Sequence, residues 1–299
     1  MYSNNYVLYA NRNTSKESWK EIRKLIRVNP CGVSDWFGGT APPYGAKDNW
    51  KDDTLNRTSN FWNWVKNDLK RPELIPQNSP HQKLGYRMSL KEVGEKTLPF
   101  PFHIIGLDTA WSCGDDNDAQ KIVLTNAQLD MLTTNEDGKE LQGFKLCLGH
   151  HPLTDLADSK DAKRILSKNI DLYLFGHQHH PIAENSVDSD SSFRSIAAGS
   201  LYEGDKGEKW INCFNVIDIL CDESGTPLKY SIQFWGWSEK GHWYPYGAIY
   251  KDATDGILNW ELKQNDRSTT ITSKNNTKNQ VDSYYTDLIA LITKELFLH

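Results

Sequence analysis

Five of the nine histidines lie between positions 150 and 180, in two short groups. Residues 149–152 read Gly-His-His-Pro and follow the apolar run Phe144–Leu148, while residues 176–181 read Gly-His-Gln-His-His-Pro and follow the apolar run Leu172–Phe175. The carboxyl ends of buried parallel strands meet at one edge of an α/β sheet, where sites form. Imidazole is the commonest neutral metal ligand and binds Mn, Fe, Ni and Zn. A lone histidine at a strand end is usually a structural residue, but two groups that share this placement indicate a metal site.

The segments around these groups have the alternation typical of an α/β domain. Apolar strands are predicted at residues 102–107, Phe144–Leu148 and Leu172–Phe175. Between the first two, Thr125 is expected to cap a helix, and a second helix is expected between the last two. From residue 193 onward only strands are predicted, at residues 195–198, 213–220, 230–237 and 257–262.

The segments at the two ends of the chain lack the strand–helix alternation of the central part. A helix is expected from the spacing of Trp19, Ile22 and Ile26, then an extended loop over residues 30–60 and a second helix from residue 61 to 69. We therefore expect a helical and loop insertion region at 1–83, the main domain at 84–263, a polar linker at 264–280 and an amphipathic helix at 281–299.

Composition excludes several classes of protein. The net charge of −5 does not indicate a protein that coats nucleic acid. Five cysteines at irregular spacing, with no C-x-x-C pair, argue against a disulfide framework or a zinc ribbon. No apolar run reaches the roughly 18 residues of a membrane span, and no signal-peptide pattern is seen at the start. We expect a cytoplasmic protein with no membrane partner.

The histidine groups resemble two motifs of one family. Residues 176–179 (Gly-His-Gln-His) are similar to the G-H-x-H signature of calcineurin-like metallophosphoesterases, and residues 150–152 resemble the family's H-x-P element. The resemblance covers roughly residues 84–262. It implies an α/β, metallophosphoesterase-type sandwich of two sheets flanked by helices, and phosphoester hydrolysis at a centre of two divalent metal ions (Mn, Fe, Zn or Ni). His150 and His177 would then bind one metal and His179 the other, while His151 and His180 match no ligand position.

The family's carboxylate-bearing motifs D-x-H, G-D-x-x-D and G-N-H-D/E are not found in residues 1–100. We therefore expect an N-terminally incomplete domain that hydrolyses its phosphoester substrate weakly or not at all when alone, and that self-associates through an exposed edge of its parallel sheet. Two alternatives stay open, a non-catalytic relic that acts as a binding or structural module and a nuclease of the same fold. The sequence leaves open the substrate, the metal, the oligomeric state and the origin of the missing motifs.

Overall fold

Two β-sheets and a set of helices make up the structure. The computed structural model describes residues 16–72, 75, 84–93, 96–114, 118–187, 191–200 and 212–262. The six-stranded sheet has the order β1-β2-β3-β4-β6-β5, and the smaller sheet has the order β10-β8-β7 with β9 also paired to β8. The strands are β1 (Tyr86–Val93), β2 (Lys96–Gly106), β3 (Phe144–Leu148), β4 (Leu172–Phe175), β5 (Ile182–Val187), β6 (Ser192–Ala197), β7 (Cys213–Cys221), β8 (Pro227–Trp237), β9 (Trp243–Pro245) and β10 (Ile257–Glu261).

The helices fall into two sets. The first set is N-terminal and comprises α2 (Lys16–Val28), α3 (Pro30–Phe37), α4 (Asn49–Leu55), η1 (Asn56–Thr58) and α5 (Ser59–Asn67). The second set connects strands of the large sheet and comprises α6 (Asn126–Thr133), η3 (Leu153–Asp155) and α7 (Ser159–Asn169). Among the described residues, no helix has both the length and the apolar character that a bilayer crossing requires.

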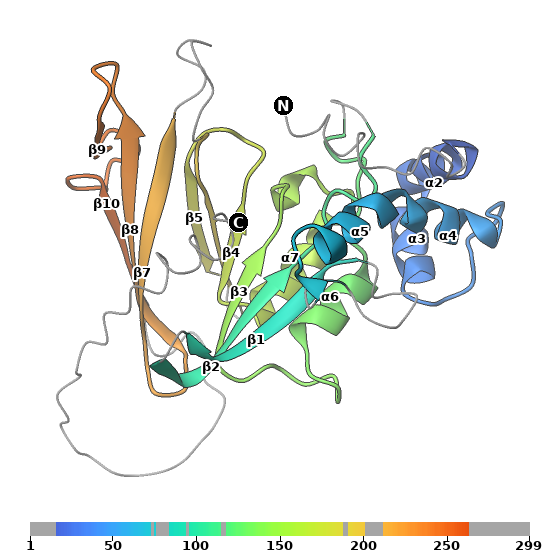
Figure 1. The fold of residues 1–299 in the computed structure, drawn as a ribbon, viewed down its shortest axis with the longest axis horizontal. Helices are drawn as coiled ribbons and strands as arrows, with labels where there is room; N and C mark the ends of the chain where they lie inside the picture. The colour runs from blue at the N-terminus through green and yellow to red at the C-terminus, as the bar shows by residue number, and fades with distance from the viewer. Residues whose placement is uncertain are drawn as a thin grey trace.

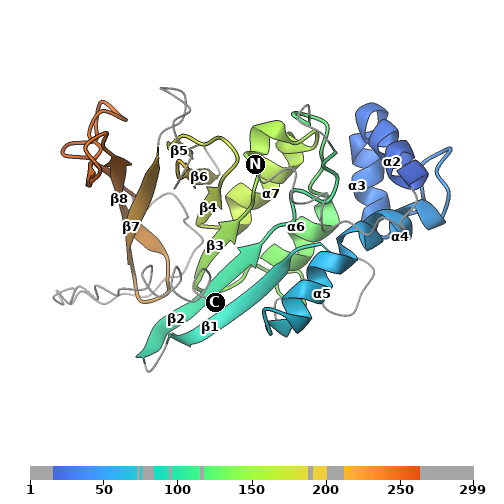
Figure 2. The same cartoon turned by 45° about the horizontal axis from the view of Figure 1, so that its top comes forward.

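The elements form layers (Figures 1 and 2). The four-stranded sheet lies against one face of the six-stranded sheet, and α6 and α7 lie against the other face. Neighbouring residues of one strand serve different layers: Ile104 packs toward the smaller sheet, whereas Ile105 packs toward the helices. This follows from the two-residue period of a strand, and it makes both faces of β2, β3 and β4 apolar. The predicted fold class, an α/β sandwich of two sheets flanked by helices, is confirmed.

The extended loop predicted over residues 30–60 is wrong, because α3, α4 and η1 occupy much of it. The helix α2 ends at Val28, directly before Asn29 and Pro30, and these two residues begin α3. The Asn29 side chain accepts a hydrogen bond from the Gly32 N–H at 2.9 Å, and Pro30 lies in the first turn of α3. Both features favour a helix start. Apolar residues of α2 and α3 then pack around the buried Trp111.

The edges of the large sheet also differ from expectation. Its outer strands β1 and β5 both run antiparallel to their neighbours, so the parallel strands β2, β3, β4 and β6 lie inside the described sheet. Self-association through an edge stays a prediction. The expected linker at 264–280 and helix at 281–299 lie outside the described residues, and the proposed boundary near residue 84 stays a prediction.

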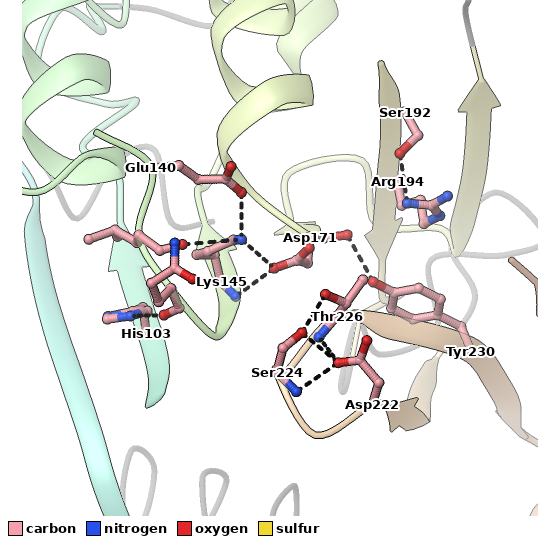
Figure 3. Close-up of polar contacts among 12 residues, drawn as sticks. His103, Glu140, Lys145, Asp171, Ser192, Arg194, Asp222, Ser224, Thr226 and Tyr230 are labelled. Carbon is pink, nitrogen blue, oxygen red and sulfur yellow. Dashed lines mark hydrogen bonds and ion pairs between the residues drawn. The ribbon is translucent and has the colours of Figure 1, made fainter. Parts of the chain in front are cut away.

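A buried ion pair lies at the end of the parallel strands that is opposite to the histidine loops (Figure 3). The Lys145 ammonium is 3.4 Å from a carboxylate oxygen of Asp171, and both side chains are almost fully buried. Glu140 lies 3.1 Å from the same ammonium. The Tyr230 hydroxyl, from the smaller sheet, donates to the backbone carbonyl of Asp171 at 3.0 Å. The Tyr230 hydrogen bond therefore connects the smaller sheet to the buried ion pair of the larger sheet.

Candidate metal centre

Two loops carry the histidines, and each leaves the carboxyl end of a parallel strand. β3 and β4 pair in parallel, with Leu148 opposite Leu174. The N–H of Gly149 donates to the carbonyl of Leu174 at 2.9 Å, and the N–H of Gly176 donates to the carbonyl of His150 at 3.1 Å. These backbone bonds continue the strand pairing into the loops and hold the two histidine groups side by side.

The glycine that precedes each group has a different role. A Cβ at Gly149 would lie 2.2 Å from the hydroxyl oxygen of Tyr173, which donates a 2.7 Å hydrogen bond to the carbonyl of His151. A side chain at this position would therefore displace the loop. A Cβ at Gly176 would meet nothing closer than 3.8 Å, so contacts alone do not require glycine there.

His150 and His177 present ring nitrogens to one another. The distance between Nε2 of His150 and Nδ1 of His177 is 3.3 Å. Two nitrogens bound to one tetrahedral ion at about 2.0–2.1 Å are separated by roughly 3.3–3.4 Å. Both residues are exposed at the surface, so a cation has access to them. The pair therefore has the spacing of two ligands of a single metal ion.

The loop that carries His177 has an unusual backbone. His177 has a φ of 67° and His179 a φ of 56°, both in the left-handed region. A residue with a Cβ is disfavoured there by roughly 1–2 kcal/mol, and such residues concentrate at functional sites. A glycine at either position would relieve the strain. The chain therefore retains imidazoles where the backbone favours glycine.

A third imidazole, His151, completes a group in which the ligand atoms all lie within 4.8 Å of one another. Its hydrogen bonds nevertheless argue against a ligand role. The hydroxyl oxygen of Thr109 accepts the backbone N–H groups of His150 and His151, at 3.0 and 3.1 Å. A hydroxyl has two lone pairs and one hydrogen, so the hydrogen is left for Nδ1 of His151, 3.0 Å away.

The second ring nitrogen of His151 is engaged as well. Because Nδ1 accepts a hydrogen bond, Nε2 carries the proton in the neutral ring, and it lies 3.6 Å from the sulfur of Cys113. His151 is buried, in contrast to its two exposed neighbours. We conclude that His151 supports the loop.

A carboxylate beside the cluster was missed in the sequence. Asp155, in η3, places an oxygen 3.8 Å from Nε2 of His177. Histidines that bind a metal through one nitrogen commonly direct the other to a carboxylate, which fixes the tautomer. Asp155 therefore favours the tautomer of His177 that carries its proton on Nε2 and leaves the lone pair of Nδ1 facing His150. The available signal was an aspartate only five residues after His150, in a loop already suspected of metal binding.

The pKa values of His150 and His151 are both lowered, mainly by desolvation. The atoms around the exposed His150 ring desolvate it and, with the nearby His177 and His179, lower its pKa to about 4. Burial, with His150 and His177, lowers the pKa of His151 to about 3. Near neutral pH these rings carry no charge, which is the form that binds a cation. Burial also raises the pKa of Asp155, while His177 acts in the opposite direction.

The predicted ligands are placed as follows. His150 and His177 come together, and the donor set of imidazoles with a nearby carboxylate fits a first-row divalent ion. His179 lies close enough to act on His150 electrostatically but is outside the three-histidine group found among the described residues. His180 is exposed and its Nδ1 lies 2.8 Å from the Gln178 carbonyl. A second metal at His179 stays a prediction.

Comparisons with known proteins show limited similarity. No family model and no curated protein matches the chain. One solved structure, "GAP50 the anchor in the inner membrane complex of Plasmodium", is 17% identical, with 60% of this chain and 54% of that chain covered and a TM-score of 0.27. A putative 5'-nucleotidase from Staphylococcus aureus, in complex with alpha-ketoglutarate, is 14% identical, with coverages of 84% and 44% and a TM-score of 0.26. The chain spans about half the length of each.

Proposed function

We propose that this chain binds one divalent transition-metal ion through Nε2 of His150 and Nδ1 of His177, and that the site descends from a metal-dependent phosphoester hydrolase. The observation that supports this most strongly is the 3.3 Å separation of the two nitrogens, on loops that leave adjacent parallel strands. The left-handed backbone of His177 is a second, independent argument. Substrate, where one binds, would be a phosphoester.

The residues of this chain have separate tasks at such a site. His150 and His177 hold the cation, Asp155 orients the His177 ring, and Thr109 fixes the backbone of both residues in the His150–His151 pair. The metal, when bound, polarises a phosphoryl oxygen and lowers the pKa of a bound water.

Activity of the isolated chain is a separate question. A bridged pair of cations needs several anionic ligands, and Asp155 is the carboxylate that the described residues bring within ion-pair distance of the cluster. This favours metal binding with little or no hydrolysis. The second candidate, a non-catalytic binding module that keeps its metal, rests on the same observation.

Calorimetric titration with Mn²⁺ or Zn²⁺ tests the site. The wild type is expected to bind one equivalent, His177→Ala to lose this binding, and His180→Ala, a change of the same kind three residues away, to retain it. Equal binding by His177→Ala and the wild type would contradict the proposed site.

Hydrolysis of a chromogenic phosphodiester, measured with Mn²⁺ present, separates the two candidates. Turnover that disappears in His177→Ala would show a working hydrolase. Metal binding without turnover would support the binding module.

A further inference from the structure

A basic groove runs along α7. It has a volume of about 390 Å³ and is lined by four cationic side chains, Lys160, Lys163, Arg164 and Lys168. All four are exposed, whereas Phe193, which contributes to the floor, is buried. The Lys163 ammonium lies 5.7 Å from the centre of the Phe193 ring. The groove therefore combines an apolar floor with a row of positive charges. We refer to it as the α7 groove.

The charge of the α7 groove is opposite to that of the protein. The whole chain carries a net charge of −5, yet the described lining of the groove contains four cations and no carboxylate. Asp161, on the same helix, lies 3.5 Å from Arg164 in an exposed pair, which is weak in water. A solvated helix face commonly alternates the two signs of charge, whereas a one-sided row of cations over a hollow attracts anions.

The cations follow one another along the helix axis. Lys160, Arg164 and Lys168 are spaced by four residues, so they rise in steps of about 6 Å and span about 12 Å. A small anion such as phosphate needs donors that converge on one point. A ladder of cations suits a linear ligand that carries a phosphate at each step.

We propose that the α7 groove binds the backbone of single-stranded nucleic acid. A positively charged groove that follows the strand is the usual feature of such sites. Net charge gave no indication of this ligand because it averages a local excess over the whole surface.

One end of the groove lies next in sequence to Asp155 of the candidate metal centre. Leu153 and Thr154 line it, and the next residue is Asp155, whose carboxylate lies 3.8 Å from His177. A strand held along α7 would therefore bring a phosphodiester toward the histidine pair. This placement rests on the proposed metal site, whereas binding to the groove requires no metal.

Fluorescence anisotropy with a short labelled oligodeoxythymidylate, in EDTA, tests the proposal. Each phosphate contact with a single strand contributes about −0.7 to the slope of log K against log salt, so four contacts predict a slope of about −3. The variant Lys160→Gln/Lys163→Gln/Lys168→Gln is expected to lose about 2 of this slope and to bind on the order of tenfold or more weakly at low salt.

A matched variant controls for total charge. Lys66→Gln/Lys240→Gln/Lys251→Gln removes three exposed lysines outside the groove and is expected to keep the wild-type slope. An equal loss in this variant, or no loss in the groove variant, would overturn the proposal. Displacement of the oligonucleotide by an equal concentration of pyrophosphate would also overturn it, because a small anion would then be the ligand.

Failure of the proposed nucleic-acid binding in the α7 groove is distinguishable from failure of the proposed metal site. The groove variant is expected to bind Mn²⁺ or Zn²⁺ as the wild type does, and His177→Ala is expected to bind the oligonucleotide in EDTA as the wild type does.

Discussion

The left-handed backbone of His177 allows the strain at the candidate site to be separated from its chemistry. His177→Gly and His177→Ala both remove the imidazole, but only glycine adopts a φ of 67° without steric cost. In the absence of metal, we therefore expect the glycine variant to be the more stable of the two.

The size of the effect follows from two opposing quantities. Releasing a residue with a Cβ from the left-handed region contributes roughly 1–2 kcal/mol. The greater conformational freedom of glycine in the unfolded chain lowers the free energy of unfolding of the glycine variant by about 0.4–1 kcal/mol. The net advantage of His177→Gly over His177→Ala is then about 0.5–1 kcal/mol, which for a domain of this size raises the unfolding midpoint by about 2 °C.

Thermal unfolding in EDTA, followed by circular dichroism, measures this difference. The same scans with Zn²⁺ at about 100 times its Kd should stabilise the wild type by about 2.7 kcal/mol and neither variant. Strain and ligation are thus measured on one residue by one method.

His180 provides the matched control, since its φ is not positive. There the order should reverse, with glycine less stable than alanine by about 0.5–1 kcal/mol. The reasoning is refuted if His177→Gly is no more stable than His177→Ala, or if both positions respond alike.

Three further predictions concern carboxylates. Asp155→Asn should weaken Zn²⁺ binding about 10- to 100-fold in calorimetry, because the partner of His177 is lost, whereas the exposed Asp161→Asn should not. Burial raises the pKa of Asp108 to about 6. The folded protein therefore binds a proton at Asp108 more tightly than the unfolded chain does. The free energy of unfolding should fall by about 3 kcal/mol as the pH rises from about 4 to 6. Urea unfolding of Asp108→Asn, which cannot titrate, should lack this fall, and an unchanged pH profile would contradict the assignment. Lys145→Met should cost about 3–5 kcal/mol in urea unfolding by leaving the buried Asp171 without its cation, and an unchanged midpoint would show that this pair does not stabilise the fold.

Much of the fold was accessible from the sequence because its signals are local. The apolar runs of β3 and β4 and the cap of α6 were predicted, and the Thr125 side chain does accept the N–H of Gln128. The helices α3 and α4 were missed because residues 30–60 are rich in glycine, proline, asparagine and aspartate. Their stability comes from packing around Trp111, a residue far away in sequence. Tertiary contacts of this kind leave no periodic pattern.

The candidate site, like the fold, was predictable from the sequence only in part. Residue type and strand position pointed to both histidine groups, and only the resemblance to the H-x-P element separated His150 from the adjacent His151, since both have the same donor atoms. The structure adds an argument from Thr109: its hydroxyl oxygen accepts two backbone N–H groups, which leaves the hydroxyl hydrogen for Nδ1 of His151. His151 is thereby committed to the loop, and His150 remains available to face His177. On the proposed metal site, the hydrogen bonds of this one hydroxyl distinguish His150 from His151.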